Sequence, residues 1–289
     1  GEADFVVIEH IGTPRTFDFQ PKDHVELGKL LGAIDTERGA KVAGSRSYYL
    51  TGAGAMLEFA LVNYAISSAL KAGFTPVIPP VLVNPAAMEG TGFLGQAAEN
   101  VYHLEKDDVY LVGTSEVPLA AMHMDEILPA DKLPMRYAGY SSCFRREAGS
   151  WGAHVRGLNR LHQFDKIEIV QIQKPEKSYA ALEEMSLHVQ GLLQKLNLHY
   201  RVLRLCGGDM GFASALTYDM EVWSGAQNRW LEVSSVSNFE TFQANRLKCR
   251  YKDSEGKTQL VHTLNGSALA LPRILASILE NNQGPDGIK

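Results

Sequence analysis

The chain has 289 residues, enough for one large domain or two ordinary ones, and its 28 Lys and Arg against 33 Asp and Glu leave a net charge of −5. This charge excludes a protein that holds nucleic acid through bulk positive charge, although it allows a local basic patch. Hydrophobic residues (45%) and charged residues (21%) occur in globular proportions, which excludes a disordered chain. The three scattered cysteines predict a reducing compartment, and no uninterrupted apolar run approaches the roughly 20 residues of a membrane span.

The first third of the chain predicts two helices and one unusual strand. Residues 1–46 are polar and rich in turn formers, with one short helix expected at residues 23–34. Residues 55–72 predict a longer helix whose apolar side chains occupy more than one face, so it is either central in its domain or shared with another subunit. Residues 75–83 predict a proline-rich strand, and because proline cannot donate to a ladder, this strand belongs at an edge or a special junction.

The rest of the chain predicts a long series of strands with two helices. Strands are expected at residues 109–112, 137–144, 167–172, 200–205, 218–223, 230–233 and 259–264. An amphipathic helix at residues 179–196 interrupts the series, and another helix at residues 271–281 closes it. Because so few helices separate the strands, we expect an α+β fold with an antiparallel β-sheet flanked by helices.

Charged side chains concentrate around a predicted hairpin in the middle of the chain. Alternate residues share one face of a strand, so the first strand would present Arg145 and Glu147, and the second Arg160, Phe164 and Glu168. Guanidinium groups bind phosphate oxygens, and an aromatic ring stacks on a base. A surface hairpin with solvated salt bridges is the alternative, and the pattern alone leaves both open.

Glycine-rich nucleotide-binding loops are missing from the sequence. No Walker A segment occurs, and residues 52–54 and 207–211 do not match the dinucleotide-binding pattern. A bound nucleotide would therefore have to be held by side chains, which favours the arginine-bearing hairpin as its site.

The same hairpin resembles the second signature motif of class II aminoacyl-tRNA synthetases. The motif consists of Phe144-Arg-Arg-Glu147 and Arg160-Leu-His-Gln-Phe164, and the residues around it resemble those of the seryl-tRNA synthetases in particular. The resemblance covers nearly the whole chain, through residues 88–93, 112–119, 232–238, 242–246 and 262–267. It implies that residues 1–289 form one class II catalytic domain. Residues 55–80 resemble the first motif, which builds the dimer interface, and Leu271-Pro-Arg273 resembles the third.

The resemblance implies a site for ATP. Arg145 would hold the α-phosphate and the substrate carboxylate, and Arg273 the γ-phosphate, because a guanidinium group is planar and permanently charged. Phe164 would stack under adenine, and Glu232 completes the expected catalytic set with the two arginines. The whole implied ATP-binding set is Arg145, Arg146, Glu147, Phe164, Glu232, Val233, Ser234, Ser235 and Arg273.

The resemblance also implies a pocket for L-serine. Its expected lining is Thr114, Ser115, Glu116, Glu168, Asn265 and Ser267. An α-ammonium group needs a carboxylate, and a pocket built to bond a hydroxyl rejects an analogue without one by roughly 10⁴-fold or more. Glu232 and Ser235 would hold Mg²⁺, which prefers oxygen ligands. No zinc is expected, because the cysteines lie away from the matching positions and zinc needs several nitrogen or sulfur ligands.

The sequence is compatible with three functions. The first is a serine–tRNA ligase that makes seryl-adenylate and charges the acceptor end of tRNA(Ser). The second is a paralogue that activates serine for a non-tRNA acceptor, and the third is a non-catalytic binding protein, against which Arg145, Glu232 and Arg273 argue. The family's N-terminal coiled-coil arm has no counterpart in this sequence, so we expect weakened transfer to tRNA. We also expect a cytoplasmic homodimer without a membrane partner, with an organellar location left open.

Overall fold

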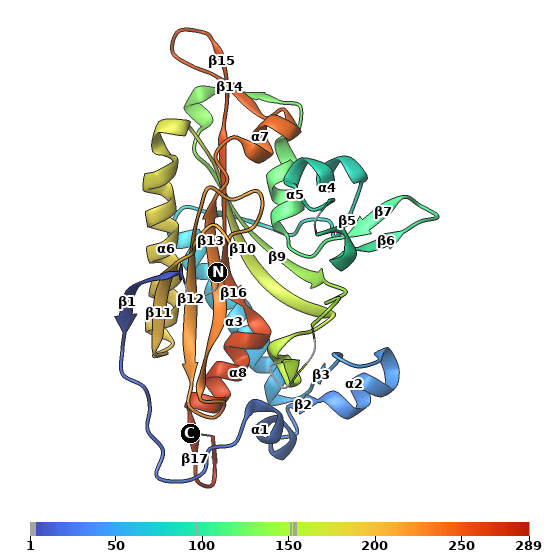
Figure 1. Ribbon diagram of the computed structural model, residues 1–289, viewed down its shortest axis with the longest axis vertical. Helices are drawn as coiled ribbons and strands as arrows, with labels where there is room; N and C mark the ends of the chain where they lie inside the picture. The colour runs from blue at the N-terminus through green and yellow to red at the C-terminus, as the bar shows by residue number, and fades with distance from the viewer. Residues whose placement is uncertain (1–3, 96, 151, 153–154, 289) are drawn as a thin grey trace.

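An eight-stranded sheet runs through the molecule (Figure 1). The computed structural model describes residues 4–95, 97–150, 152 and 155–288. The strand order is β1-β11-β12-β13-β16-β10-β9-β4, and every neighbouring pair is antiparallel except β4 with β9. The strands are β1 (Val6–Ile11), β4 (Thr75–Val77), β9 (Met135–Phe144), β10 (Gln163–Gln173), β11 (Tyr200–Arg204), β12 (Leu216–Ser224), β13 (Arg229–Asn238) and β16 (His262–Ala270). The expected α+β fold with a large antiparallel sheet is confirmed.

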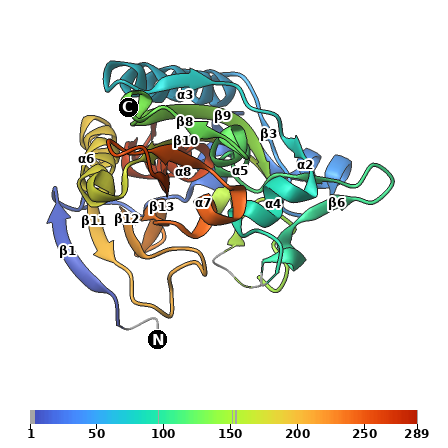
Figure 2. The same ribbon diagram turned by 90° about the horizontal axis from the view of Figure 1, so that it is seen from above.

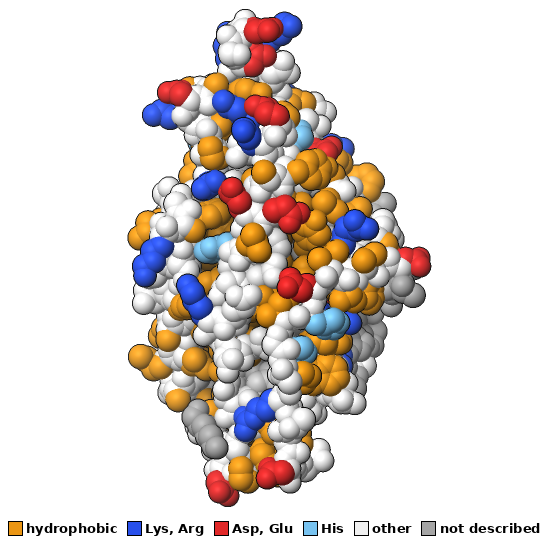
Figure 3. All heavy atoms as spheres, turned by 90° about the vertical axis from the view of Figure 1, so that its left-hand side faces the viewer, with side chains coloured by type: hydrophobic (Ala, Val, Ile, Leu, Met, Phe, Trp, Pro, Cys, Tyr) orange, Lys and Arg blue, Asp and Glu red, His pale blue; other side chains and the backbone are white. Residues whose placement is uncertain are grey.

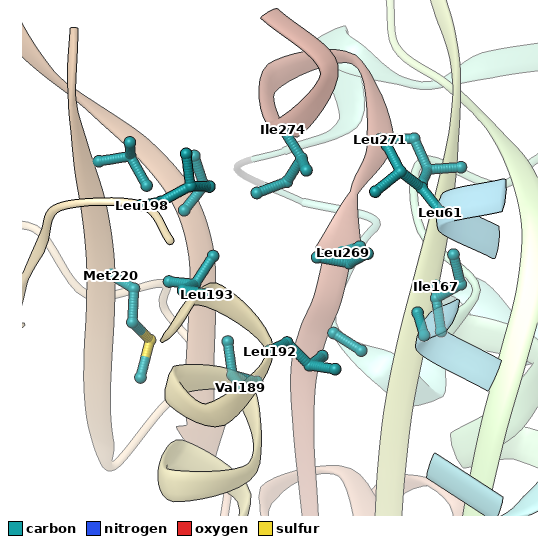
Figure 4. Close-up of a cluster of buried hydrophobic side chains, with 14 of the residues drawn as sticks. Leu61, Ile167, Val189, Leu192, Leu193, Leu198, Met220, Leu269, Leu271 and Ile274 are labelled. Atoms are coloured by element: carbon teal, nitrogen blue, oxygen red, sulfur yellow. The ribbon is translucent and has the colours of Figure 1, made fainter. Parts of the chain in front are cut away.

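Three helices cover one face of this sheet and bury the core. They are α3 (Ala53–Lys71), α6 (Ser178–Lys195) and α8 (Leu271–Asn281), close to the predicted boundaries. Seen from above, α3 and α6 lie on one side of the sheet, and α4 and α7 on the other (Figure 2). Ile167 of β10 and Leu269 of β16 meet Leu61, Leu192 and Ile274 of the three helices (Figure 4). The core face of the sheet is therefore apolar, which leaves the opposite face for polar side chains.

Short helices and small sheets surround that opposite face. The helices are α4 (Pro85–Thr91), α5 (Glu116–Ala120) and α7 (Phe242–Leu247). One small sheet pairs β5 (Leu82–Val83), β6 (Tyr102–Leu104) and β7 (Val109–Leu111), and another pairs β8 (Ile127–Leu128), β14 (Arg250–Lys252) and β15 (Thr258–Leu260). The remaining elements are α1 (His24–Leu30), β2 (Ile34–Asp35), α2 (Thr36–Ala43), β3 (Tyr49–Leu50), β17 (Gln283–Gly284) and β18 (Gly287–Ile288).

One predicted helix is shorter than expected, and two predicted strands are divided. The helix expected at residues 23–34 ends at Leu30, because the chain turns at Gly32 (φ +61°) and Ile34 pairs with β3 instead. The strand expected at residues 75–83 is two strands in different sheets, β4 and β5, since prolines separate them; β4 does lie at an edge, as predicted. The strand expected at residues 259–264 is likewise divided between β15 and β16.

Helix α3 is buried on one side only. By length and apolar composition it could cross a membrane, but Leu61, Ala65 and Ala69 pack in the core. On its other side Met56 and Phe59 are 66% and 62% exposed. The prediction that α3 carries apolar side chains on more than one face is therefore confirmed. No element in the described part of the chain covers its outer side.

Charge is distributed evenly over the face that carries β1, β11 and α6. Acidic and basic side chains are interspersed there, between scattered apolar ones (Figure 3). The described side chains of this face form no single-sign patch of the kind that steers a charged macromolecule.

Candidate active site

The turn after β9 brings the hairpin's charged residues together, but not on a strand face as predicted. Strand β9 ends at Phe144, and Glu147 has a left-handed backbone (φ +52°), so the alternation argument fails for Arg145 and Glu147. Arg160 lies before β10, yet its Nη1 donates to Glu147 Oε2 at 3.0 Å. Residues 151, 153 and 154 of the hairpin loop lie outside the described residues.

We call the hollow next to this turn the arginine cavity. Its polar lining is Arg145, Glu147, Asn159, Arg160, Lys166, Glu232, Ser234, Ser267 and Arg273, and its apolar lining includes Phe164 and Val233. The Arg145 guanidinium carbon lies 5.2 Å from the centre of the Phe164 ring. An aromatic face beside several guanidinium groups suits a flat base attached to an anion.

Backbone carbonyls fix two of the three arginines that line this cavity. Arg273 donates from Nη1 to the Glu232 carbonyl (2.7 Å) and from Nε to the Asn159 carbonyl (3.0 Å). Arg145 donates from Nε to the Gly113 carbonyl (3.1 Å). Burial lowers the pKa of the Arg273 guanidinium; Glu232 opposes this effect, and Arg145 and Arg160 add to it. Guanidinium groups crowded in this way favour a bound anion.

The second hollow, the acidic cavity, has a volume of about 840 Å³. Its lining includes Thr114, Glu116, Lys166, Glu168, Asp219, Glu232, Ser235, Asn265 and Ser267. Arg145, Lys166, Glu232 and Ser267 line both cavities, so the two share a wall. A ligand in one cavity can thus touch a ligand in the other.

A buried ion pair organises the floor of the acidic cavity. Lys166 Nζ lies 2.6 Å from Glu168 Oε2 and donates to Thr114 Oγ1 at 2.8 Å. Ser267 Oγ donates to the same carboxylate oxygen at 3.5 Å. Strand β10 supplies both ionised groups, since Lys166 and Glu168 are alternate residues on the face away from the core.

A second carboxylate faces the first across the cavity. Gln243 Nε2 donates to Glu116 Oε1 at 2.7 Å, and Thr263 Oγ1 donates to Gln243 Oε1 at 2.7 Å, which fixes the amide orientation. Burial, followed by repulsion from Glu168, raises the pKa of Glu116 to about 7. Two carboxylates held this close provide a strong site for a cationic group.

A third acidic group sits where β12 faces β13. Asp219 is opposite Ser235 in the strand register, and the Ser235 hydroxyl bonds to its carboxylate. Asp219 Oδ1 is buried without a hydrogen-bond partner among the described residues. Burial, and then the charge of Glu232, raise the pKa of Asp219 to about 7. A cation bound beside these oxygens would relieve that repulsion.

Comparison with known proteins identifies the family. Residues 100–282 match the family model of the tRNA synthetase class II core domain (G, H, P, S and T). The chain is 57% identical over 290 aligned residues to serine–tRNA ligase 1 of Streptomyces avermitilis, covering 99% of this chain and 68% of that protein. The chain belongs to the seryl-tRNA synthetases, a family of class II aminoacyl-tRNA ligases. The resemblance read from its motifs is confirmed.

Solved structures of the family superpose on the chain closely. The seryl-tRNA synthetase of Pyrococcus horikoshii complexed with ATP has a TM-score of 0.96 at 39% identity, over 99% of this chain and 69% of that one. The cytoplasmic enzyme of Naegleria fowleri in complex with AMP has a TM-score of 0.95 at 32% identity, over 100% of this chain and 70% of that one. The fold class is thereby confirmed for the whole chain.

Most, but not all, of the predicted site residues line the two cavities. Ser115 lines neither cavity: it is fully buried where α5 begins. Arg146 also lines neither: its side chain is exposed, and its backbone N–H donates to the Asn100 carbonyl. The structure brings the remaining predicted residues into the two cavities.

Three site residues were missed by the sequence reasoning. Lys166 lies between Phe164 and Glu168 in the strand, so the spacing that selected those two should have selected it as well. Gln243 falls inside a motif that was recognised without a role for its side chain. Asp219 carried no signal, because its approach to Ser235 depends on the pairing of β12 with β13.

Proposed function

We propose that this chain activates L-serine with ATP and transfers it to the 3′ end of tRNA(Ser). The observation that carries the proposal is the wall shared by the two cavities. Arg145 stands in that wall between the guanidinium groups and the carboxylates. The α-phosphate of ATP and the carboxylate of an amino acid would meet there, at one guanidinium group.

The arginine cavity is proposed as the ATP site. Phe164 stacks with adenine, Arg145 binds the α-phosphate, and Arg273 binds the γ-phosphate from the start of α8. Glu147, Arg146, Val233 and Ser234 complete the nucleotide contacts, with Arg146 reaching ATP only through a change in its side-chain position. The P. horikoshii relative, which was solved with ATP, supports ATP as the nucleotide.

The acidic cavity is proposed as the serine site. Glu116 and Glu168 provide the carboxylates that an α-ammonium group requires, and Thr114, Asn265 and Ser267 provide small polar contacts. A hydroxyl in such a pocket is bonded on several sides, so alanine would leave buried polar atoms unpaired. Ser115 lies at the start of α5, where its buried hydroxyl has no hydrogen-bond partner among the described residues, and it is not proposed to touch serine.

The reaction follows from this arrangement as an in-line displacement. A serine carboxylate oxygen attacks the α-phosphorus, the bond from that phosphorus to the bridging oxygen breaks, and pyrophosphate leaves with the electron pair. The new bond is the mixed anhydride of seryl-adenylate, which the 3′-terminal ribose hydroxyl of tRNA then attacks to release AMP. Arg145, Arg273 and Glu232 act by positioning and charge stabilisation, and no covalent enzyme intermediate is needed.

Magnesium fits the group of oxygens at β12 and β13. Glu232 and Ser235 would hold the ion, and the unpaired Asp219 Oδ1 beside them is the kind of atom a hard cation binds. The ion would neutralise negative charge on the phosphates. No zinc is proposed, because Cys143 and Cys249 are buried elsewhere in β9 and near β14.

A homodimer through residues 55–83 is also proposed. The outer side of α3 exposes Met56, Phe59 and Leu70, and Ile78 just beyond β4 is 87% exposed. A second copy of the chain would cover this apolar stripe and remove its side chains from water, which is favourable. Sedimentation should give a dimer, and M56E with F59E should shift it to monomer, whereas L187E on exposed α6 should not. Wild-type monomer at micromolar concentration would refute the dimer.

The remaining proposals concern organisation and location. Residues 1–289 are proposed to act as one catalytic domain that works in the cytoplasm without a membrane partner. Fractionation of the cells that express it tests the location.

Serine-dependent exchange of pyrophosphate into ATP tests the function, run across all amino acids. We expect exchange with serine far above that with alanine or threonine. Exchange with no amino acid would refute the proposal, and exchange with serine but no charging of tRNA(Ser) would favour the non-tRNA acceptor.

A further inference from the structure

Lysine 166 occupies an unusual position between the two cavities. Strand β10 presents Phe164, Lys166 and Glu168 in turn on its polar face, from the arginine cavity to the acidic cavity. Lys166 lines both, and its side chain is only 7% exposed. Lysine is rarely this buried unless its charge is paired.

The contacts of Lys166 are all with the serine side. Its ammonium group binds Glu168 Oε2 at 2.6 Å and Thr114 Oγ1 at 2.8 Å. Within the described part of the chain these two are its polar partners, so one of its three N–H donors remains for a ligand. Among the described residues nothing donates to Glu168 Oε1, so this oxygen is left as the acceptor for a ligand. Lys166 thus determines which oxygen of Glu168 faces the pocket.

Charge balance gives the pair a second consequence. Glu116 and Glu168 are two carboxylates in one buried pocket, and Lys166 pairs directly with one of them. The carboxylate that Lys166 leaves over can pair with the single α-ammonium group of an amino acid. Without Lys166, Glu116 would lose one of the two cations that lower its pKa.

Other charged groups face this trio from the surrounding elements. Arg145 follows β9, and the Cys143 thiol lies within it. The rest of the cavity wall carries Glu89, Asp209, Asp219, Glu232 and Arg246. Arg145 is the cation other than Lys166 that lowers the pKa of Glu116. Lys166 is the one cation, among the described residues, that is bonded to Glu168.

We propose that Lys166 is a specificity-determining positioning residue, which pairs with Glu168 and aims its carboxylate so that the pocket selects a small hydroxylated amino acid. This inference rests on the proposed function. A carboxylate can only accept hydrogen bonds, so the oxygen of Glu168 that faces the pocket requires a donor from the substrate side chain. Alanine would leave that buried oxygen without a donor, which costs free energy. Lys166 thereby makes the pocket reject alanine.

The test compares Lys166→Met, which removes the charge, with Lys166→Arg, which retains it. In pyrophosphate exchange, Lys166→Met should raise the KM for serine at least about 10-fold and the KM for ATP less than about 3-fold. The preference for serine over alanine should fall by at least about 10-fold. The acid limb of kcat/KM for serine should move up by about one pH unit or more, because Lys166 lowers the pKa of Glu116, which gains a proton more easily without it. Lys166→Arg should leave that limb in place.

Controls separate this inference from the proposed function. Lys257→Met changes an exposed lysine on the distal β14–β15 loop and should match wild type. Wild type without serine exchange would refute the function itself. Active wild type with an unmoved acid limb and unchanged serine preference in Lys166→Met would overturn the role of Lys166 alone.

Two further variants keep the inference testable. If Lys166→Met does not fold, Lys166→Gln takes its place with the same expectations. Adding Glu168→Gln to Lys166→Met should return the acid limb toward wild type, since the uncompensated carboxylate is then gone. A double variant whose limb stays as high as that of Lys166→Met would contradict the inference.

Discussion

The arginine cavity and the acidic cavity share a wall but are held together differently. In the arginine cavity backbone carbonyls fix the guanidinium groups of Arg145 and Arg273. In the acidic cavity side chains fix one another, Lys166 with Glu168 and Gln243 with Glu116. Guanidinium groups keep their charge at any physiological pH, whereas carboxylates near neutrality do not. The nucleotide side should therefore be insensitive to pH and the amino-acid side sensitive.

The largest expected effect comes from the residue in the shared wall. Arg145→Ala removes the guanidinium group proposed to bind both the α-phosphate and the serine carboxylate. Serine-dependent exchange should fall by about 10³-fold or more, as when an arginine is taken from a phosphoryl-transfer site. Arg204→Ala, on the exposed end of β11, is the matched control. Exchange at the wild-type rate in Arg145→Ala would disprove the assignment of the wall.

A substitution in the acidic cavity should affect the KM for serine much more than the KM for ATP. Glu116→Ala removes one carboxylate and leaves the arginine cavity intact, so the KM for serine should rise by about 100-fold while that for ATP changes by less than about 3-fold. Steady-state exchange with each substrate varied in turn measures both. Glu105→Ala, on the exposed β6–β7 turn, is the control. Equal rises in both constants would show that the cavities are not independent.

The pH dependence of the unmodified protein sharpens the same contrast. With the pKa of Glu116 near 7, kcat/KM for serine should fall by about tenfold per unit below that pH, whereas ATP binding should not. Stability should change in the opposite direction. A carboxyl pKa raised on folding stabilises the free protein at low pH, and this contribution is lost as pH rises from about 4.5 to 7. Glu116→Gln should remove both trends; a Gln variant that retains them would exclude Glu116 as their source.

How much of this could be predicted depends on the kind of signal. Helix periodicity predicted the ends of α6 and α8 to within about one residue. The motifs predicted Arg145, Phe164 and Glu232 as site residues, and all three line the arginine cavity. Two-residue alternation applied correctly within β10 but failed just past β9, where Glu147 takes a left-handed backbone. Local rules thus held inside elements and failed at their ends.

Pairing between distant strands was not predictable from local patterns. Asp219 meets Ser235 only because β12 and β13 pair in one particular register, which includes an irregularity after Met220. The ion pair of Lys166 with Glu168 was within reach of the alternation rule, but its hydrogen bond to Thr114 requires the loop before α5 to lie over β10. Non-local contacts of this kind decide protonation, so the pH behaviour could not be read from the sequence.

A buried network supports the arginine cavity from behind. His24 Nδ1 lies 2.7 Å from Glu280 Oε1, and His24 Nε2 accepts the Leu158 N–H at 2.9 Å, so the ring proton is on Nδ1. Next to Leu158, the Asn159 carbonyl accepts from Arg273. Burial would raise the pKa of Glu280, but bonds from His24, Ser224 and Gln227 hold it below its usual value.

Breaking this network should have the smallest effect on activity. It should change the KM for ATP but not the KM for serine. His24→Leu leaves the fully buried Glu280 carboxylate without its main partner, so the free energy of unfolding should fall by about 3 kcal/mol at neutral pH. That loss should shrink as pH falls through the carboxyl range, because the wild-type advantage requires ionised Glu280. The KM for ATP should rise a few-fold through Arg273, with the KM for serine unchanged.

The control is His103→Leu, which breaks an exposed pair and should lower the free energy of unfolding by less than about 0.5 kcal/mol. Urea unfolding and exchange kinetics test both statements, and a serine KM that rises as much as the ATP KM would show that the network supports the whole site rather than its nucleotide half.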